Sequence, residues 1–466
     1  MPGPGPVDVP SRERHRRILA NYAGRAERYH RALVASFART RGVTLASLIV
    51  GYMGYYLCRQ NFSAAYPLLH DQLGLGRATF GAVASTGTLL YALGKVVAGP
   101  LTDSHGGRRL FFIGLFGSVV ATMMIGLLAG GAGAGLVALF VLWSVNRLFQ
   151  SAGWGGVLSV LSRWYPRSSY GTAAGALSIS FQVGGAVAAA LCARLVSFGW
   201  RALFLGPALA LCALGVVLLP TLHGSPADAG LPPPEDPAPA ASSPQQRQGG
   251  DSEAATWRGR VASLLSRPAF LLVCALSLAL TLVRETFNTW LPAYFTDIGA
   301  SAEVASVKAA LFPLLGAVGT LLGGFISDRL LGGRRAPVLV VFLLGAGVSL
   351  LGLAHPAAVA AACGLPLPTT ALALTGATGF FLLAPYSMVG GGVLALDAGG
   401  PAAAATAAGL LDAVGYLGAT LAGIGVAEAV SHLGWGPSFA VLGGLVLGAA
   451  LLSVVLWLLT ERRRTT

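Results

Sequence analysis

The sequence has little charge, almost no lysine and no Cys-x-x-Cys pair. Charged residues make up 11% of its 466 residues, well below the share of about a quarter in soluble domains, and the mean hydropathy is +0.70. This composition predicts an integral membrane protein. All five cysteines lie in apolar segments, which argues against a disulfide framework or a zinc site. Because the sequence shows no nucleophile–base pair or cluster of metal ligands, we expect neither an enzyme nor a cofactor.

Arginine carries nearly all of the positive charge. The chain has 31 basic and 18 acidic residues, for a net charge of +13, and only Lys95 and Lys308 are lysines. Most of the arginines lie at the ends of apolar runs on one side of the predicted membrane, where basic residues set topology rather than bind nucleic acid. We therefore expect both termini in the cytoplasm, and a monomer in the lipid bilayer of the bacterial inner membrane or of an organelle in a eukaryotic cell.

Twelve apolar runs of about 20 residues are long enough to cross a bilayer as helices. A proline-rich polar stretch separates them into six and six, which predicts an all-α membrane protein with 12 transmembrane helices in two pseudo-symmetric halves. The apolar residues within 11–41 have roughly helical spacing, and two interpretations remain open, an interfacial amphipathic helix or a solvated basic tail. The predicted parts are a basic cytoplasmic segment (1–42), a first half (43–220), a flexible cytoplasmic linker (221–268), a second half (269–459) and a basic cytoplasmic tail (460–466).

Two arginines occupy equivalent places in the two halves. Arg59 and Arg284 both lie within apolar runs and are 225 positions apart, the same offset that relates Asp103 to Asp328. A charge in hydrocarbon is costly and usually faces a partner or a water-filled path. The repeated placement therefore predicts one central site that holds an anion from both sides. The alternative is that the arginines form buried ion pairs with acidic residues and only lock the helices together.

Two short loops carry the same pattern of glycine, aspartate and arginine. They read GPLTDSHGGRR (99–109) and GFISDRLLGGRR (324–335), which resembles the G-x-x-x-D-x-x-G-R-R loop of the major facilitator superfamily. We expect a charged latch at the cytoplasmic face, in which these groups pair or cap helix ends in one conformation and separate in the other. The candidate gating residues are Asp103, Arg108, Arg109, Asp328, Arg329 and Arg334.

The resemblance narrows to the organophosphate:phosphate antiporters, which are glycerol-3-phosphate, hexose-phosphate and sugar-phosphate exchangers of that superfamily. Its most specific parts are YLCRQNF (56–62) and YALGK (91–95), within a match that runs over nearly the whole membrane region. The resemblance implies that Arg59 and Arg284 hold a phosphate group and that Lys95 assists them. Guanidinium groups suit this role, because their flat fork of donors matches phosphate oxygens.

Two tyrosines in the matching segments are further candidates for substrate contact. Tyr56 and Tyr91 either offer hydroxyls to the substrate or only pack within the bundle. The resemblance also implies alternating access, in which the halves rock about a central site. An empty site with two positive charges resists closing, so only the loaded carrier would cross the membrane, and transport would be an exchange.

Three features depart from the pattern of that family. Many members have glycine where this chain has Arg147, and glycerol-3-phosphate carriers have histidine where it has Phe181. Glu285 lies directly beside Arg284, although a carboxylate near a bound phosphate is unfavourable unless it points away or is neutralised. Arg147 either pairs with Asp412 or Glu285 or extends the anion site. The carbon part of the substrate is therefore not predicted.

Three functions remain as hypotheses. The first is exchange of an organic phosphate, such as glycerol-3-phosphate or a sugar phosphate, for inorganic phosphate. The second is a sensor of sugar phosphates that does not transport, because the family that the chain resembles contains receptor-like members. The third is a proton-coupled carrier of organic anions or drugs, in which Glu285 and Asp412 take up protons.

Overall fold

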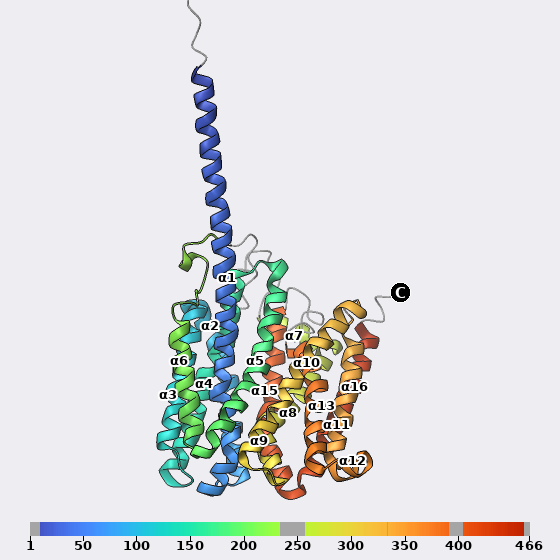
Figure 1. The fold of residues 1–466 in the computed structure, drawn as a ribbon. Coiled ribbons are helices and arrows are strands. Elements are labelled where there is room, and N and C mark those ends of the chain that lie inside the picture. The colour runs from blue at the N-terminus through green and yellow to red at the C-terminus, as the bar shows by residue number, and fades with distance from the viewer. Residues whose placement is uncertain (1–9, 234–256, 333, 391–403, 461–466) are drawn as a thin grey trace, which may run out of the picture.

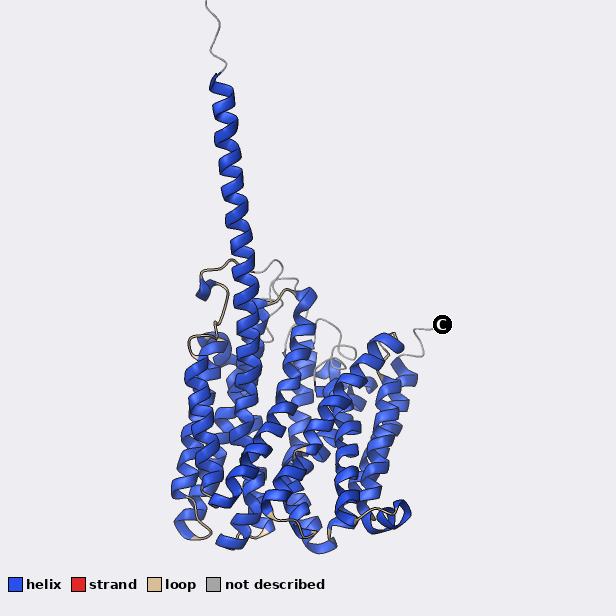
Figure 2. Ribbon diagram, viewed as in Figure 1, coloured by secondary structure: helices blue, strands red, loops and turns tan. Residues whose placement is uncertain are grey.

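The computed structural model describes residues 10–233, 257–332, 334–390 and 404–460, and these form a bundle of helices (Figure 1). Figure 2 shows no strand in this described part of the chain. Eleven of the described helices are long and apolar enough to cross a membrane, and the shorter apolar helix α6 (Ala202–Leu218) supplies the twelfth span. The predicted all-α fold with 12 spans is confirmed. A helix satisfies its own backbone hydrogen bonds in lipid, which is why each apolar run forms one.

Six of the spans belong to the first half of the chain. The turn between its second and third helices contains Gly106, whose φ of 85° is a conformation that favours glycine. Gly332 has a φ of 61° in the matching turn of the second half, so the repeated glycines of the two loops permit tight turns. The elements of the first half are α1 (Pro10–Leu73), α2 (Arg77–His105), α3 (Gly107–Leu128), α4 (Gly133–Trp164), α5 (Arg167–Leu195), the 3-10 turn η1 (Val196–Phe198) and α6.

The second half contains the other six spans and several short helices. Its elements are α7 (Trp257–Leu265), α8 (Pro268–Asp297), α9 (Ala302–Ala309), α10 (Leu311–Phe325), the π-helical turn η5 (Ile326–Leu330), α11 (Ala336–Ala354), α12 (Pro356–Cys363), α13 (Leu367–Gly390), α15 (Ala404–Leu433) and α16 (Trp435–Thr460). α9 and α10 together make one span. The segment predicted as a flexible linker contains α7 and the short turn η2 (Ala227–Ala229), and its middle, 234–256, lies outside the described residues.

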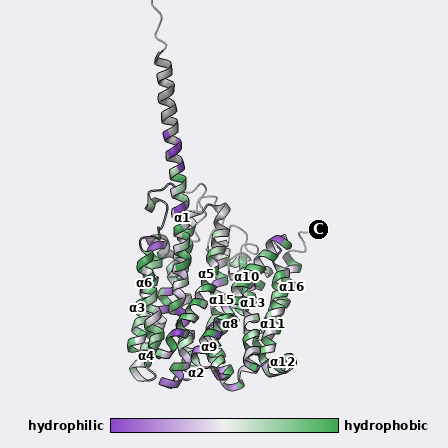
Figure 3. Cartoon of the chain, viewed as in Figure 1, coloured by the Kyte–Doolittle hydropathy of each residue, from purple (hydrophilic) through white to green (hydrophobic). Residues whose placement is uncertain are grey.

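The first helix extends far beyond the bundle. α1 begins at Pro10, so the basic segment within 11–41 is helical. Figure 1 shows this part as a straight continuation of the span that points away from the bundle. Figure 3 shows hydrophilic residues on the described part of the extension and mainly hydrophobic residues on the bundle. We call the end of the bundle where α1 emerges the linker end, and the opposite end the closed end.

The three largest clusters of buried apolar side chains are one in each half and one that both halves share. The cluster of the first half includes Phe111 and Leu161, and that of the second half includes Leu339 and Val446. The shared cluster combines residues of α1, α2 and α4 with residues of α8 and α15. Its members lie toward the closed end of these helices, so the burial of apolar surface holds the two halves together there.

Candidate functional site

Aromatic side chains join the halves on the closed-end side of Arg59. Phe62 lies one turn beyond Arg59 on α1 and stacks on Phe80 of α2, with ring centres 4.4 Å apart. Trp290 of α8 packs edge-on against Phe80 and against Tyr66, at 5.4 and 5.6 Å. These rings are almost fully buried, so they exclude water between the halves at this level.

Polar contacts between the halves lie on both sides of these rings along α2. Ser85 of α2 donates to the carbonyl of Thr420 at 2.6 Å and accepts from the backbone N–H of Ile424 at 2.9 Å. Arg77 at the start of α2 forms an ion pair with Asp297 at the end of α8. Both pairs of partners come from different halves, so these contacts hold the bundle shut at the closed end.

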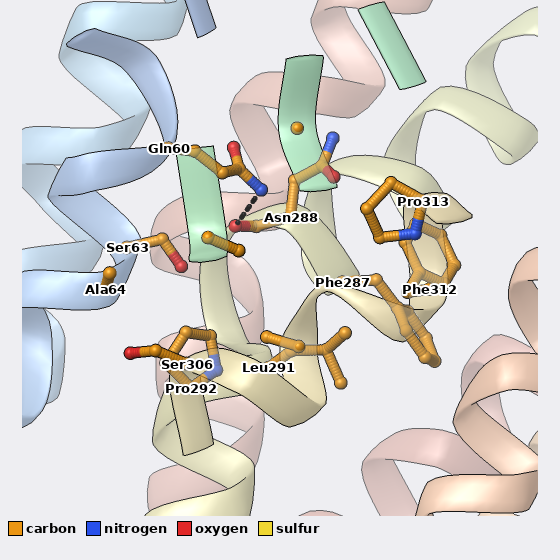
Figure 4. Close-up of a pocket in the computed structure, with 13 residues that line it drawn as sticks. Gln60, Ser63, Ala64, Phe287, Asn288, Leu291, Pro292, Ser306, Phe312 and Pro313 are labelled. Carbon is orange, nitrogen blue, oxygen red and sulfur yellow. Dashed lines mark hydrogen bonds between the residues drawn. The ribbon is translucent and has the colours of Figure 1, made fainter. Parts of the chain in front are cut away.

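A small cavity lies between the halves, on the closed-end side of Arg59. Figure 4 shows the residues that line it. Gln60 Nε2 donates to the carbonyl of Asn288 at 3.3 Å, which Figure 4 marks, and Ser63 Oγ donates to the carbonyl of Thr289 at 2.7 Å. The cavity, including its open mouth, has a volume of about 350 Å³ and is lined mainly by apolar side chains and backbone. It contains no charged side chain, so it does not suit an anionic ligand.

A larger cavity lies between the halves and contains all the charged residues predicted for the site. Its volume, including its open mouth, is about 690 Å³. Helices α1, α2, α4 and α5 line it from one half, and α8, α13 and α15 line it from the other. The lining residues are Tyr52, Tyr56, Arg59, Tyr91, Lys95, Arg147, Trp154, Ser178, Phe181, Arg284, Glu285, Tyr386, Ser387, Asp412 and Tyr416.

The two arginines related by the 225-residue offset meet at one tyrosine hydroxyl. Arg59 Nη1 lies 3.4 Å from Tyr56 Oη, and Arg284 Nη2 lies 3.5 Å from the same atom. Tyr56 and Arg59 are one turn apart on α1, and Arg284 reaches them from α8 across the boundary between the halves. The hydroxyl therefore marks the point where the guanidinium groups of both halves converge.

Gln150 of α4 positions Arg59, a role that the sequence interpretation did not give it. Its Oε1 accepts from Arg59 Nε at 2.8 Å, and its Nε2 donates to the carbonyl of Cys58 at 2.8 Å. Cys58 has non-helical backbone angles (φ −94°, ψ 15°), so the irregular turn of α1 just before Arg59 frees the carbonyl that Gln150 binds. The available signal in the sequence was a glutamine within an apolar span, where a polar side chain needs a partner.

Arg59 retains an unused hydrogen-bond donor. Its Nη2 is buried and has no partner among the described residues. Its guanidinium carbon lies 4.9 Å from the ring centres of both Tyr56 and Tyr91, so its other neighbours are neutral aromatic faces. Arg59 is thus a buried cation without a carboxylate partner in the described part of the chain.

Lys95 forms an ion pair across the halves. Its Nζ donates to Asp412 Oδ2 of α15 at 2.7 Å and lies 4.8 Å from the ring centre of Tyr416. The sequence interpretation of Asp412 as a counter-ion agrees with this contact, although the partner is Lys95 and not an arginine. Tyr416 was not singled out from the sequence, because nothing in its spacing distinguishes it from an aromatic residue that only packs.

Arg284 is neutralised by the residue next to it. Its Nη1 donates to Glu285 Oε1 at 2.5 Å and to the hydroxyl of Tyr386 at 3.3 Å. Glu285 Oε1 also accepts from Asn288 Nδ2 at 3.3 Å. Phe181, which stands where related carriers have histidine, lies 5.8 Å from the Arg284 guanidinium carbon and contributes an aromatic ring to the cavity.

Arg147 forms no ion pair with Asp412 or Glu285, the two partners considered for it from the sequence. Its guanidinium carbon instead lies 4.7 Å from the ring centre of Tyr91. Its side chain makes no hydrogen bond within the described part of the chain, and its exposed fraction is 5%. Both acidic residues pair with other cations, Asp412 with Lys95 and Glu285 with Arg284.

The candidate gating residues lie at the linker end. Arg108 donates from Nε and Nη2 to the carbonyls of Leu222 and Leu219, both at 2.7 Å, and so caps the end of α6. The other three candidate arginines are exposed, and the side chains of the two candidate aspartates lie outside what the structure describes. The exposed residues are Arg109, Arg329 and Arg334, and the undescribed side chains are those of Asp103 and Asp328.

Two six-helix halves that meet around a charged central cavity define a secondary transporter. The chain belongs to the Major Facilitator Superfamily, whose family model matches residues 48–423. It is therefore an integral multi-pass membrane protein of a transporter family and not an enzyme. A solved structure of the peptide transporter POT in complex with sulfate shares its fold, with a TM-score of 0.69 over 90% of this chain and 95% of that chain, at 15% identity.

Relatives of known or assigned function confirm the narrower resemblance. The probable hexose phosphate transport protein of Chlamydia trachomatis serovar D is 29% identical over 425 residues, which cover 89% of each chain. The glycerol-3-phosphate transporter of Bacillus subtilis (strain 168) is 26% identical over 434 residues, 91% of this chain and 93% of its own. The membrane sensor protein UhpC of Salmonella typhimurium is 28% identical over 430 residues, 91% and 92% of the two chains. The chain is thus related to the organophosphate:phosphate antiporters.

Proposed function

We propose that this protein is an antiporter that exchanges an organic phosphate for inorganic phosphate. The observation that carries the proposal is the unpartnered Nη2 of Arg59, buried at a cavity whose lining has four basic and two acidic residues. A buried donor without an acceptor is costly, and an anion in the cavity would remove that cost. The two carboxylates already accept from Lys95 and Arg284, so neither of them serves Arg59.

The proposed phosphate site is the point where Arg59, Arg284 and Tyr56 converge. Because both guanidinium groups lie within 3.5 Å of one hydroxyl, a phosphate group beside that hydroxyl reaches both of them. The planar fork of a guanidinium matches phosphate oxygens, and a phosphomonoester carries nearly two negative charges near neutral pH. Lys95 and Tyr91 line the same cavity and complete the proposed site.

The proposed cycle is alternating access by rocking of the two halves. Contacts between them run from the level of Gln60 to the closed end, whereas the Lys95–Asp412 ion pair joins them at the large cavity. Substrate would therefore enter this conformation from the linker end, past that ion pair. An empty cavity with surplus positive charge resists closing, because desolvated charges need partners. Any phosphate, organic or inorganic, supplies those partners. Only the loaded carrier then reorients, which makes transport an exchange.

The remaining parts of the chain are proposed to serve this movement. The halves over 43–220 and 269–459 rotate as units, joined on the cytoplasmic side by the linker over 221–268. The two Gly–Asp–Arg loops form the latch at that face, and Arg108 contributes by holding the end of α6. The protein works as a monomer, since one chain supplies every residue of the cavity, in the bacterial inner membrane or in an organelle membrane of a eukaryotic cell.

Counterflow in proteoliposomes tests the proposal. Vesicles that contain the purified protein and unlabelled inorganic phosphate should take up labelled phosphate, and external organic phosphates should compete with it. Arg59→Lys should abolish this uptake, because lysine cannot present the donor fork. Arg163→Lys, a matched change at an exposed arginine of α4, should leave uptake intact. Uptake that persists in Arg59→Lys would contradict the proposed phosphate site.

A sensor without transport is the second candidate, since one relative at 28% identity is named a membrane sensor protein. Specific binding of a sugar phosphate, measured by calorimetry, together with no counterflow from loaded vesicles, would favour it. Proton-coupled carriage has less support. Asp412 and Glu285 are each ion-paired to a basic residue, which suits counter-ions better than proton sites.

A further inference from the structure

We infer that Arg147 forms a second anion subsite beside the proposed phosphate site, so that the preferred organic substrate is a phosphate ester with a carboxylate at its other end. The inference rests on the proposed function and names the class of substrate for the same cavity. Its starting point is a cation in the cavity wall that the proposed phosphate site does not use.

Arg147 is a desolvated cation that faces the cavity without an anionic partner. Only 5% of its surface is exposed, and it lines the cavity from α4. Among the described residues, the two carboxylates of the cavity belong to other ion pairs, Asp412 with Lys95 and Glu285 with Arg284. Ionisable groups inside a membrane bundle usually mark the path of a substrate. An anionic group of the substrate would supply the partner that the protein does not.

Arg147 is held near the proposed phosphate site but remains separate from it. Its guanidinium carbon lies 4.7 Å from the ring centre of Tyr91, and that of Arg59 lies 4.9 Å from the same centre. Its stem packs tightly against α2, where a Cβ added at Gly87 would lie 3.0 Å from Arg147 Cγ. Gln150, one turn along α4, holds Arg59. Both cations are therefore fixed relative to the same helix, and a short substrate can contact both.

The chemistry of arginine selects a carboxylate over a hydroxyl at this place. A guanidinium has five donors and no acceptor, and it binds a carboxylate through two parallel hydrogen bonds. A hydroxymethyl group at the same place would leave the buried charge uncompensated.

Two three-carbon phosphates that differ at one end test the inference. Glycerol-3-phosphate has a hydroxymethyl group where 3-phosphoglycerate has a carboxylate. In phosphate-loaded proteoliposomes, the unaltered protein should take up 3-phosphoglycerate with a half-saturation concentration at least about tenfold lower. Arg147→Gln should raise that value about tenfold or more. Arg147→Gln also removes one of the four positive charges of the cavity, so glycerol-3-phosphate uptake and the exchange of inorganic phosphate for itself should weaken too. Their losses should be at least about threefold smaller than the loss for 3-phosphoglycerate, since neither substrate places a carboxylate at Arg147.

Control variants separate a specificity role from a structural one. Arg147→Lys keeps the charge and should retain part of the preference for 3-phosphoglycerate over glycerol-3-phosphate. Arg163→Gln, at an exposed position of the same helix, should leave the uptake of both substrates unchanged. Equal losses for all three substrates in Arg147→Gln would overturn the inference, and so would an unchanged preference. An unaltered protein that prefers glycerol-3-phosphate would overturn it too. Failure of the proposed function looks different, because even inorganic phosphate would then not exchange for itself.

Discussion

Arg59 and Arg284 are equivalent in the sequence but lie in different electrostatic surroundings. Arg59 contacts neutral groups: Gln150 Oε1 accepts from its Nε at 2.8 Å, and two tyrosine rings face its guanidinium. Arg284 donates to Glu285, the next residue in the chain, and to the hydroxyl of Tyr386. The sequence repeat therefore places Arg59 and Arg284 in equivalent positions, but only Arg284 has a carboxylate beside it that offsets its charge.

This difference gives the two halves unequal tasks. An arginine with neutral partners keeps its full attraction for an anion, whereas a carboxylate beside Arg284 competes with the ligand for the same guanidinium. We expect Arg59 of the first half to supply most of the phosphate affinity and Arg284 of the second half to bind phosphate more weakly. Four predictions test this asymmetry, and their expected effects decrease in the order in which they follow.

The lysine variants of the two arginines should differ most. Arg59→Lys should lower the rate of phosphate exchange at least about 100-fold and Arg284→Lys about tenfold, because each loses charge-assisted hydrogen bonds but Arg284 contributes fewer free donors. Initial rates of labelled phosphate counterflow, at matched amounts of reconstituted protein, measure both. Equal losses, or a larger loss for Arg284→Lys, would show that the halves are electrostatically equivalent.

Gln150→Met should raise the half-saturation concentration for phosphate about tenfold, since a hydrogen bond to a charged group contributes about 1.5–3 kcal/mol. Methionine keeps the length of the side chain but removes the acceptor for Arg59 and the donor for the Cys58 carbonyl. The same substitution in an Arg59→Lys background should add little, because the two residues act together. Additive losses in the double variant would separate Gln150 from Arg59.

Glu285→Gln should lower the half-saturation concentration for phosphate about fivefold, because it removes the carboxylate that competes for Arg284 and makes the second half more like the first. Glutamine can still accept from Arg284 and Asn288, so the local packing is kept. Glu303→Gln, at an exposed residue of α9, is the control. Weaker phosphate binding in Glu285→Gln would mean that Glu285 orients Arg284 instead of competing with the ligand.

Asp297→Asn should have the smallest effect. Its ion pair with Arg77 joins the halves at the closed end, but the side chains are 30% and 33% exposed, and such pairs contribute about 0.2–1 kcal/mol. We expect the exchange rate to change about twofold, with an unchanged half-saturation concentration, because the pair affects only the balance between conformations. A shift in the half-saturation concentration would link the closed end directly to phosphate binding.

The sequence located the charged residues of the cavity because charge within an apolar span needs polar surroundings. The 225-residue offset related Arg59 to Arg284, and the structure places both beside the same tyrosine hydroxyl. The spans themselves were predictable for a similar reason, since an apolar run in lipid can satisfy its backbone only as a helix. Both predictions follow from the free-energy cost of placing a single charge, or the unpaired backbone groups of a single segment, in lipid.

The choice of partners could not be predicted, because it depends on contacts between distant segments. Lys95 and Asp412 are 317 positions apart, and nothing in either segment selects one for the other. Tyr386 and Tyr416 have the sequence surroundings of ordinary packing residues and differ only in facing the cavity. The role of Gln150 depends on the irregular turn at Cys58, which no pattern in the sequence marks.

The ring of Tyr91 is shared by three cations. Its centre lies 4.9 and 4.7 Å from the guanidinium carbons of Arg59 and Arg147, and 5.5 Å from Lys95 Nζ. The face of an aromatic ring attracts a cation without carrying a formal charge. The ring of Tyr91 can thus stabilise the surplus positive charge of the cavity without a formal negative charge. An anionic substrate then has no carboxylate of the described chain to displace from Arg59 or Arg147.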